Sequence, residues 1–570
     1  MMDATPPLPH RMPLPAVLVL LACLAAGGFA VLLNGRFYSR NQPFYDSMSY
    51  HEQVHRVMQL ARSEGLGAAL STACRSSTVC LPLVMAAIAG PFCAPSRAVG
   101  IAIQVAELLF FAGTLLFYLR QVRRFDAWTA VLGILPFLAW HCLYDFNGGL
   151  SDFRMDLSLA LLTSTTVLWY LIAMATGRTL HFLTLGLTAA ATCLFRATAP
   201  VYLVLMLTPL AIADLIPAAT RRQRFVGLLI AAAAATLGAA WFFVFNYQKL
   251  YFYYVVWNTD ANAHLPLRES LAHARFAFQH VGVAAALLAL SFPIVLGIES
   301  LLHRTRHAPA TTSAALTPPR PDWRIAWVGI APILLLVGRG AGLNPFVSMP
   351  ATFGLTLFAM LPLAGPLRHA PSQSARLAIA AVAVPCLLMA GIQGWRAHHG
   401  GNVDSMAAHR AALDAIAADA RRQGRDTAAY ATTHCYSLNR GSLHSVAVFD
   451  HPDVVLAGSE PRLHGVALQP NACIDIAAQA DWDRVPGATD DEKLAQLLAA
   501  ADRDLDYLAI PDEATTAFVS EHLPFNVINR HAVTLRQRLL DGGRWTPVSD
   551  PIRNGDHEVV TIYRNTHGLP

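Results

Sequence analysis

The chain has 570 residues, of which 54% are hydrophobic and 14% are charged. Soluble domains carry roughly 25% charged residues, so this composition excludes an ordinary soluble enzyme. The formal net charge of +5 does not require a nucleic-acid partner, because the excess arginine lies in loops between hydrophobic runs, where it orients a membrane protein.

About eleven hydrophobic runs precede residue 394, and each is close to the ~20 residues that an α-helix needs to cross a bilayer. The first run has a positive flank, Arg11, as a signal peptide does, but Asn34-Gly35-Arg36 is a poor cleavage site, so we interpret it as a spanning helix. The expected spans are 14–33, 98–119, 127–143, 157–176, 180–195, 200–216, 226–246, 281–299, 324–338, 346–366 and 374–393.

Arginines cluster in alternate loops between these runs, and such loops are typically cytoplasmic. This rule places the N-terminus inside, and it places 34–97, 144–156, 196–199, 247–280, 339–345 and everything after 394 outside. It requires that Thr78–Gly90, at about 13 residues, does not cross, and we expect an interfacial or re-entrant segment there. The scarcity of lysine suggests a GC-rich bacterial genome. The predicted location is therefore a bacterial inner membrane, with a cytoplasmic N-terminus and a periplasmic C-terminal domain.

Residues 394–570 are soluble in composition, which divides the chain into a transmembrane domain (1–393, with the external loop 34–97) and a periplasmic domain (394–570). Apparent helices alternate there with short β-like runs, which predicts a small α/β domain with a partly parallel sheet. No nucleotide-binding glycine motif is present, so the domain is interpreted as structural or as a lid that guides the acceptor. The expected helices are Asp404–Arg422, Asp491–Ala501 and Ala532–Leu540, and the expected strands are Thr427–Tyr430, Ser445–Phe449, Val454–Ala457, Asp506–Ile510 and Glu558–Tyr563.

Four of the nine cysteines can be grouped by compartment, Cys74 with Cys80 and Cys435 with Cys473, all on the predicted outer side. An oxidising periplasm permits both disulfides, but spacing alone establishes neither pairing.

Asp46 follows the first predicted span closely and is flanked by Tyr45 and Tyr50. His51–Leu60 continues as an amphipathic helix that would lie on the membrane surface. Asp46 is therefore either the N-cap of this helix or a catalytic base. The two roles are compatible, because a helix N-terminus also holds anions.

The segment Tyr144–Asp156, YDFNGGLSDFRMD, lies between two hydrophobic runs. Charges at a bilayer boundary cost free energy unless they are solvated, paired or bound to something polar. Asp152 or Asp156 could simply cap the helix that begins at Leu157, with Arg154 as a salt-bridge partner. In the alternative, the two aspartates orient Asp46, bind acceptor hydroxyls or hold a divalent cation, and Arg154 pairs with a carboxylate or grips phosphate.

Two further outer cations are candidate phosphate ligands. Arg196 lies in LFRATAP, a loop too short to be idle surface. Arg268 flanks the aromatic segment Tyr251–Ser270, although an interfacial aromatic belt also explains those aromatic residues.

The first external loop with Asp46, the run Leu81-Pro82-Leu83 and the run Ala94-Pro95-Ser96-Arg97 resemble GT-C glycosyltransferases. The chain is most similar to the branch of protein O-mannosyltransferases and lipid A aminoarabinose transferases. This resemblance covers most of the chain as architecture and a few short patches as motifs. It implies a GT-C-like fold, a polyprenyl-phosphate-linked sugar as donor, a lipid, protein or polysaccharide acceptor, and inversion of the sugar with Asp46 as base. It assigns no certain cofactor and no metal ligand.

Two other classes of function remain open. A transporter or flippase of lipid-linked sugars would show internal repeats and charges near mid-membrane, whereas the ionisable residues here cluster at the outer ends, with Glu107 the main exception. A non-catalytic envelope scaffold would tolerate substitution of its external acids.

Overall fold

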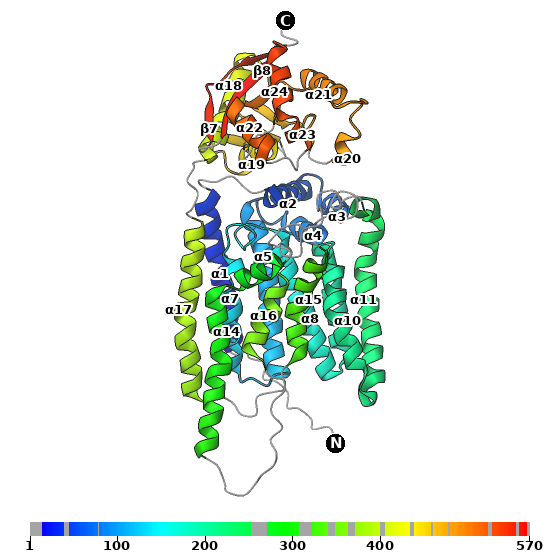
Figure 1. Ribbon diagram of the computed structural model, residues 1–570, viewed down its shortest axis with the longest axis vertical. Helices are drawn as coiled ribbons and strands as arrows, with labels where there is room; N and C mark the ends of the chain where they lie inside the picture. The colour runs from blue at the N-terminus through cyan, green and yellow to red at the C-terminus, as the bar shows by residue number, and fades with distance from the viewer. Residues whose placement is uncertain are drawn as a thin grey trace.

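The structure is a computed structural model. It describes residues 14–38, 45–77, 79–251, 271–306, 322–339, 348–362, 371–398, 405–433, 438–457, 460–476, 479–522, 527–554 and 558–566. A bundle of long helices forms one part, and a mixed α/β part lies at one end of this bundle (Figure 1).

Six helices of the described chain are long and apolar enough to cross a membrane, and shorter apolar helices complete the bundle. The protein is therefore a multi-pass membrane protein, while the count of eleven spans stays a prediction. The long helices are α1 (Leu14–Tyr38), α5 (Arg97–Gln121), α8 (Met155–Thr176), α11 (Ala218–Tyr251), α14 (Ala272–Arg306) and α17 (Gln373–Ala397), and the shorter ones include α9 (Thr179–Phe195), α10 (Ala199–Leu215), α15 (Trp323–Arg339) and α16 (Ala351–Met360).

The expected span 127–143 is not one helix. Gly133 ends the first piece, and Pro136 lies at the start of the second. Proline lacks an N–H and its ring clashes with the carbonyl four residues earlier, so the helix cannot run through. The segment forms three short pieces, α6 (Ala127–Leu132), α7 (Leu135–Leu138) and the 3-10 helix η1 (His141–Leu143).

Helix α8 lies at the centre of the bundle, and 94% of its most apolar 18-residue window is buried. Three of its threonine hydroxyls donate to backbone carbonyls four residues earlier, at 2.5 Å (Thr163), 2.7 Å (Thr165) and 2.8 Å (Thr166). These local hydrogen bonds satisfy polar groups that would otherwise be costly inside the bundle. Because α8 is buried within the bundle, the polar loop that precedes it lies over the middle of the bundle.

Arginine-rich loops meet at the end of the bundle far from the α/β part. Helix α5 starts at Arg97, next to that part, and its 25 residues rise about 37 Å. Beyond its far end, Arg123 pairs with Asp322 at 3.2 Å, and Arg376 pairs with Asp126 at 3.4 Å. These pairs bring together three of the loops that the arginine pattern assigned to one side, namely those that precede α6, α15 and α17.

Three short helices lie between the bundle and the α/β part, namely α2 (Tyr45–Ser63), α3 (Leu66–Cys74) and α4 (Cys80–Ala89) (Figure 1). The ten residues of α4 rise about 15 Å, too little to span a bilayer, as expected for Thr78–Gly90. Cys74 and Cys80 are free thiols in the structure, and Cys435 of the other proposed pair lies outside the described residues.

The C-terminal part contains a mixed sheet of eight strands in the order β2-β3-β4-β1-β5-β8-β6, with β7 paired to β8. Strand β1 runs parallel to β4 and β5, and the other pairs are antiparallel. The partly parallel sheet is therefore confirmed. The strands are β1 (Thr427–Thr432), β2 (Val454–Ala457), β3 (Glu460–Leu463), β4 (Val466–Pro470), β5 (Tyr507–Pro511), β6 (Trp545–Pro547), β7 (Ile552–Asn554) and β8 (Glu558–Asn565).

Helices cover the sheet, and two separate hydrophobic clusters fill the space between the layers. The three predicted helices are confirmed, with bounds that differ by a few residues. The helices are α18 (Ser405–Arg422), α19 (Arg440–Phe449), α20 (Gln479–Trp482), α21 (Asp490–Asp504), α22 (Glu513–His522), α23 (Val527–Arg530) and α24 (Ala532–Asp541).

The expected strand Ser445–Phe449 is wrong, because these residues form the second half of helix α19. The side chain of Asn439 accepts a hydrogen bond from the Ser442 N–H at 2.9 Å and caps the helix. Leu443 and Val446 are buried on one face at helical spacing. The local preference of valine and phenylalanine for strands is overridden by this cap and this packing.

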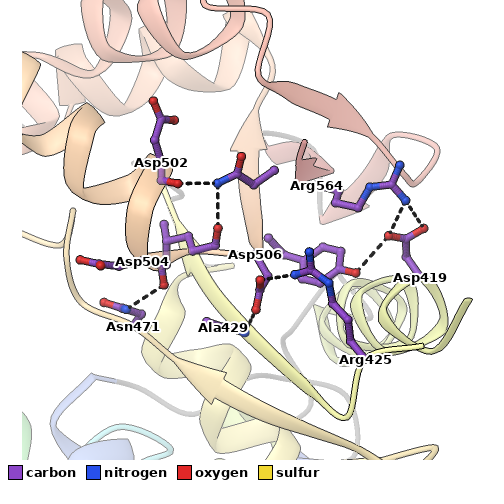
Figure 2. A network of polar contacts seen from close by, with 11 residues as sticks. Asp419, Arg425, Ala429, Asn471, Asp502, Asp504, Asp506 and Arg564 are labelled. Atoms are coloured by element: carbon purple, nitrogen blue, oxygen red, sulfur yellow. Dashed lines mark hydrogen bonds and ion pairs between the residues drawn. The ribbon is translucent and has the colours of Figure 1, made fainter. Parts of the chain in front are cut away.

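A polar network joins α18 to the sheet (Figure 2). Asp419 of α18 is nearly fully buried, accepts from Tyr507 at 3.0 Å and pairs with Arg564 at 3.1 Å. Asp506 pairs with Arg425 and accepts from the Ala429 N–H at 2.9 Å. Since its charges are paired within the fold, we assign this network to the stability of the C-terminal part.

Candidate functional site

The segment Tyr144–Asp156 forms a tight loop before α8, and two glycines allow its shape. Gly148 has a φ of +95° and its N–H donates to the Asp152 carboxylate at 2.7 Å. A Cβ on Gly149 would lie 2.4 Å from the Asp145 carbonyl oxygen. Asp152 is fully buried, so one of its carboxylate oxygens is engaged in holding the glycine turn.

The capping alternative for Asp152 and Asp156 is wrong. Helix α8 begins at Met155, and its N-cap residue is Arg154, whose side chain makes no capping hydrogen bond. Asp156 lies in the first helical turn instead, where the helix dipole favours a carboxylate. Its predicted salt bridge with Arg154 is confirmed, with Nε 3.4 Å from Oδ2.

Asp156 lies between two arginines. Its second oxygen, Oδ1, is 3.4 Å from Nη2 of Arg196, which follows the end of α9. The exposed fractions of the side chains are 3% for Asp156, 11% for Arg154 and 18% for Arg196. The three groups together carry one net positive charge in a site with little water, which favours a phosphate or another anion.

Helix α2 reaches the same cluster. The Tyr50 hydroxyl accepts from Nη1 of Arg196 at 2.7 Å. Position 46 lies one helical turn before Tyr50, and residues four apart share a helix face. The structure therefore brings Tyr50, Arg154, Asp156 and Arg196 together from three segments, namely α2, the start of α8 and the end of α9. The side chains of Tyr45 and Asp46, and all of Arg268, lie outside the described residues.

Helix α2 begins at Tyr45, so Asp46 falls in its first turn rather than ahead of it. The backbone therefore places Asp46 in the first helical turn and not at the N-cap position. In either position, the unpaired N–H groups of the helix start favour a carboxylate.

Two residues that the sequence reasoning missed hold Arg154. Gln104 of α5 is fully buried, and its Nε2 donates to the Arg154 carbonyl at 2.8 Å. The Asn147 side chain accepts from Nη1 of Arg154 at 3.1 Å. A signal for Gln104 was present, since it is an uncharged polar residue within an otherwise apolar run.

His398, just past the end of α17, makes a hydrogen bond to the loop before α8. Its Nδ1 is 2.7 Å from the Gly394 carbonyl, so this nitrogen carries a proton and donates. Its Nε2 therefore accepts from the Ser151 hydroxyl, which lies 2.7 Å away. Burial lowers the pKa of His398, consistent with the neutral ring that this pattern requires.

No group of three or more His, Cys, Asp and Glu side chains within the described ranges is arranged to hold a metal ion. A divalent cation between Asp152 and Asp156 thus stays a prediction from sequence.

No known family model and no curated protein matches the sequence. Among solved structures, the chain is similar to ArnT from Cupriavidus metallidurans, a lipid A aminoarabinose transferase of the GT-C superfamily. The apo crystal structure aligns with a TM-score of 0.54 at 11% identity, covering 96% of this chain and 98% of ArnT. The structure bound to undecaprenyl phosphate aligns with a TM-score of 0.51 at 10% identity, covering 96% and 97%. The chain therefore has a GT-C-type fold, as the sequence resemblance predicted.

Proposed function

We propose that this protein is a glycosyltransferase of the bacterial inner membrane that moves a sugar from a polyprenyl-phosphate donor to a cell-envelope acceptor. The observation that carries the proposal is the cluster in which Asp156 lies between Arg154 and Arg196, at the bundle end nearest the C-terminal part. Its support is the GT-C-type fold, which is shared with a transferase crystallised with undecaprenyl phosphate.

The proposal includes the topology expected from sequence. The N-terminus is cytoplasmic, about eleven spans cross the membrane, and the periplasmic domain 394–570 covers the outer face of the transmembrane domain 1–393. In this orientation the arginine cluster lies where the phosphate of a polyprenyl lipid meets water.

The reaction requires a base and cationic help for the leaving group. Asp46 takes the proton of the acceptor hydroxyl, whose oxygen forms a bond to the anomeric carbon of the sugar. The bond from that carbon to the phosphate oxygen breaks, and the polyprenyl phosphate leaves with the electron pair. Attack opposite the leaving phosphate inverts the anomeric centre.

The positively charged cluster suits the second half of this step. Arg154 and Arg196 each contact the Asp156 carboxylate through one guanidinium nitrogen, and guanidinium groups also bind phosphate oxygens in pairs. Tyr50 orients Arg196, and Asp156 keeps the two cations close together. Tyr45 and Arg268 complete the proposed substrate-binding set.

Binding of undecaprenyl phosphate to the purified protein tests the donor half of the proposal. We expect native mass spectrometry to show a bound lipid, and we expect Arg196→Met to weaken binding at least tenfold, because a guanidinium–phosphate contact is charge-assisted. Arg178→Met is the matched control, because Arg178 is exposed at the opposite end of the same helix, α9. Equal loss in both variants, or no lipid on the wild-type protein, would contradict the proposal.

A further inference from the structure

Helix α2 packs against α19 of the C-terminal part, and aromatic rings fill the contact. Phe449 at the end of α19 lies edge-on to His55 and His51, with ring centroids 5.3 and 6.2 Å apart. Burial lowers the pKa of His55 to about 4, and burial together with Arg97 holds the pKa of His51 well below its usual range. Both imidazoles are therefore neutral near pH 7 and pack as apolar rings.

A buried ion pair fixes the same contact. Nη2 of Arg97 lies 2.5 Å from Oδ2 of Asp450, with exposed side-chain fractions of 8% and 13%. The Arg97 guanidinium also lies 4.8 Å over the Phe449 ring. A Cβ on Gly441 would approach the Met48 side chain to 2.7 Å, so the two helices are closely apposed. A buried charge is tolerated only when it is paired. An arrangement that separated Arg97 from Asp450 would therefore be costly, which makes this docking specific.

The ring contacts continue from α2 into the loop before α8. The ring centroids of His51 and Phe153 lie 5.1 Å apart. Phe153 has a φ of +50°, which is unusual for a bulky residue and requires support from its surroundings. A Cβ on Gly100 would lie 2.6 Å from the Phe153 ring, so glycine makes room for it. Phe153 is the residue between Asp152 and Arg154, so this line of rings ends within the proposed site.

We propose that the C-terminal part positions the reaction site through these rings. Phe449, acting through His51 and Phe153, holds the first turns of α2 and the loop before α8 in the arrangement that transfer requires. Phe449 is a positioning residue, because it acts through other side chains. The inference rests on the proposed function and extends it, since it gives α19 a role in the transfer step.

Glu52 gives the same contact a pH dependence. Burial raises the pKa of Glu52 to about 7, although the charges of Arg440 and Arg97 oppose the rise. Across the contact it also faces Tyr430 of β1. The nearby His444 is neutral, because burial lowers its pKa to about 4. The docked state therefore favours the protonated form of Glu52.

A carboxyl with a raised pKa contributes stability that is complete below its usual value of 4.5 and is lost as pH rises through about 7. We expect the thermal unfolding midpoint of the wild-type protein to fall, relative to the midpoint of Glu52→Gln, as the pH rises from about 4.5 to about 7. Both proteins are measured at one heating rate. Glu64→Gln, an exposed site just past the end of α2, should keep the wild-type pH dependence. Parallel curves for the wild type and Glu52→Gln would contradict the expectation.

Truncation of Phe449 tests the positioning role. We expect Phe449→Ala to lower kcat by about 10- to 100-fold, the effect of a small misplacement of reacting groups, with little change in KM for the lipid donor. Phe449→Tyr keeps the ring and should restore kcat. The matched control is Phe518→Ala on α22, since Phe518 also stacks on a histidine, His522, at 4.3 Å but belongs to a helix that packs on α24.

Hydrogen-exchange mass spectrometry provides a readout that does not depend on catalysis. In Phe449→Ala the amides of α2 and of residues 144–154 should exchange faster, and in Phe518→Ala they should not. Faster exchange with an unchanged kcat would overturn this inference and leave the proposed function intact. A wild-type protein without transferase activity would overturn the proposed function, and the exchange data would still show whether α19 holds α2. Phe449→Leu serves the same comparison if the alanine variant does not fold.

Discussion

Replacing Asp46 with asparagine is expected to abolish sugar transfer while leaving membrane insertion and folding intact. Asparagine has nearly the same shape but cannot accept the proton of the acceptor hydroxyl. General-base catalysis contributes about 10²- to 10⁴-fold in rate, so the product should fall below detection. Mass spectrometry of envelope glycolipids and glycoproteins from a deletion strain, complemented with each variant, measures the effect. A missing hexose or pentose in that comparison would also identify the donor sugar and the acceptor.

The control for this experiment lies just past the end of the same helix. Glu64→Gln makes an equivalent change of charge beyond the last turn of α2, where the side chain is exposed, and it should complement the deletion fully. Wild-type levels of glycan in the Asp46→Asn strain would refute the assignment of Asp46 as base. Loss in both strains would mean that transfer responds to the charge of α2 in general.

Removal of the Asp156 carboxylate is expected to cost about 3–5 kcal/mol of stability, because it removes a buried carboxylate that pairs with two guanidinium groups. The side chain is only 3% exposed and lies 3.4 Å from both Arg154 and Arg196. The unfolding midpoint of Asp156→Ala in detergent should therefore drop by several degrees. In contrast, Asp481→Ala breaks an exposed pair with Arg484, in which the side chains are 51% and 69% exposed, and should shift the midpoint little.

A double variant separates the structural role of Asp156 from the chemical role of its partners. Asp156→Ala combined with Arg196→Met removes one carboxylate and one guanidinium, so part of the lost stability should return. Lipid binding should not return, because a phosphate ligand is missing. Recovery of undecaprenyl-phosphate binding in the double variant would show that Arg196 serves Asp156 alone.

Much of the candidate site was visible in the amino-acid pattern. Charges beside long apolar runs cost free energy unless they are solvated, paired or bound, and this rule drew attention to Arg154, Asp156 and Arg196. Tyr50 was selected because it flanks Asp46. The structure brings these four residues into contact. It also shows that Asp152 accepts a backbone N–H from its own loop, a role that no spacing argument indicated.

The residues that support the site were harder to predict. Gln104 donates to the Arg154 carbonyl, and Gly100 leaves space for the Phe153 ring. Both partners belong to a loop about 50 residues further along the chain. Phe449 was assigned to a strand, because valine and phenylalanine favour strands locally. The Asn439 cap and the packing of α19 on its own domain make this segment helical, and the packing of α19 on α2 places the Phe449 ring beside His51.

The sequence by itself determined that this is a membrane protein with polar loops between its hydrophobic runs and a C-terminal α/β part. Hydrophobic length, arginine placement and residue periodicity act locally, so they can be read without coordinates. The tertiary structure alone decided which of the charged residues meet, and that the expected span 127–143 is broken. It also decided that YDFNGGLSDFRMD contacts Gln104, His398 and the ring of His51, which lies against Phe449 of the C-terminal part. Those contacts depend on how distant helices pack, and packing is set by the whole set of side-chain shapes rather than by any one segment.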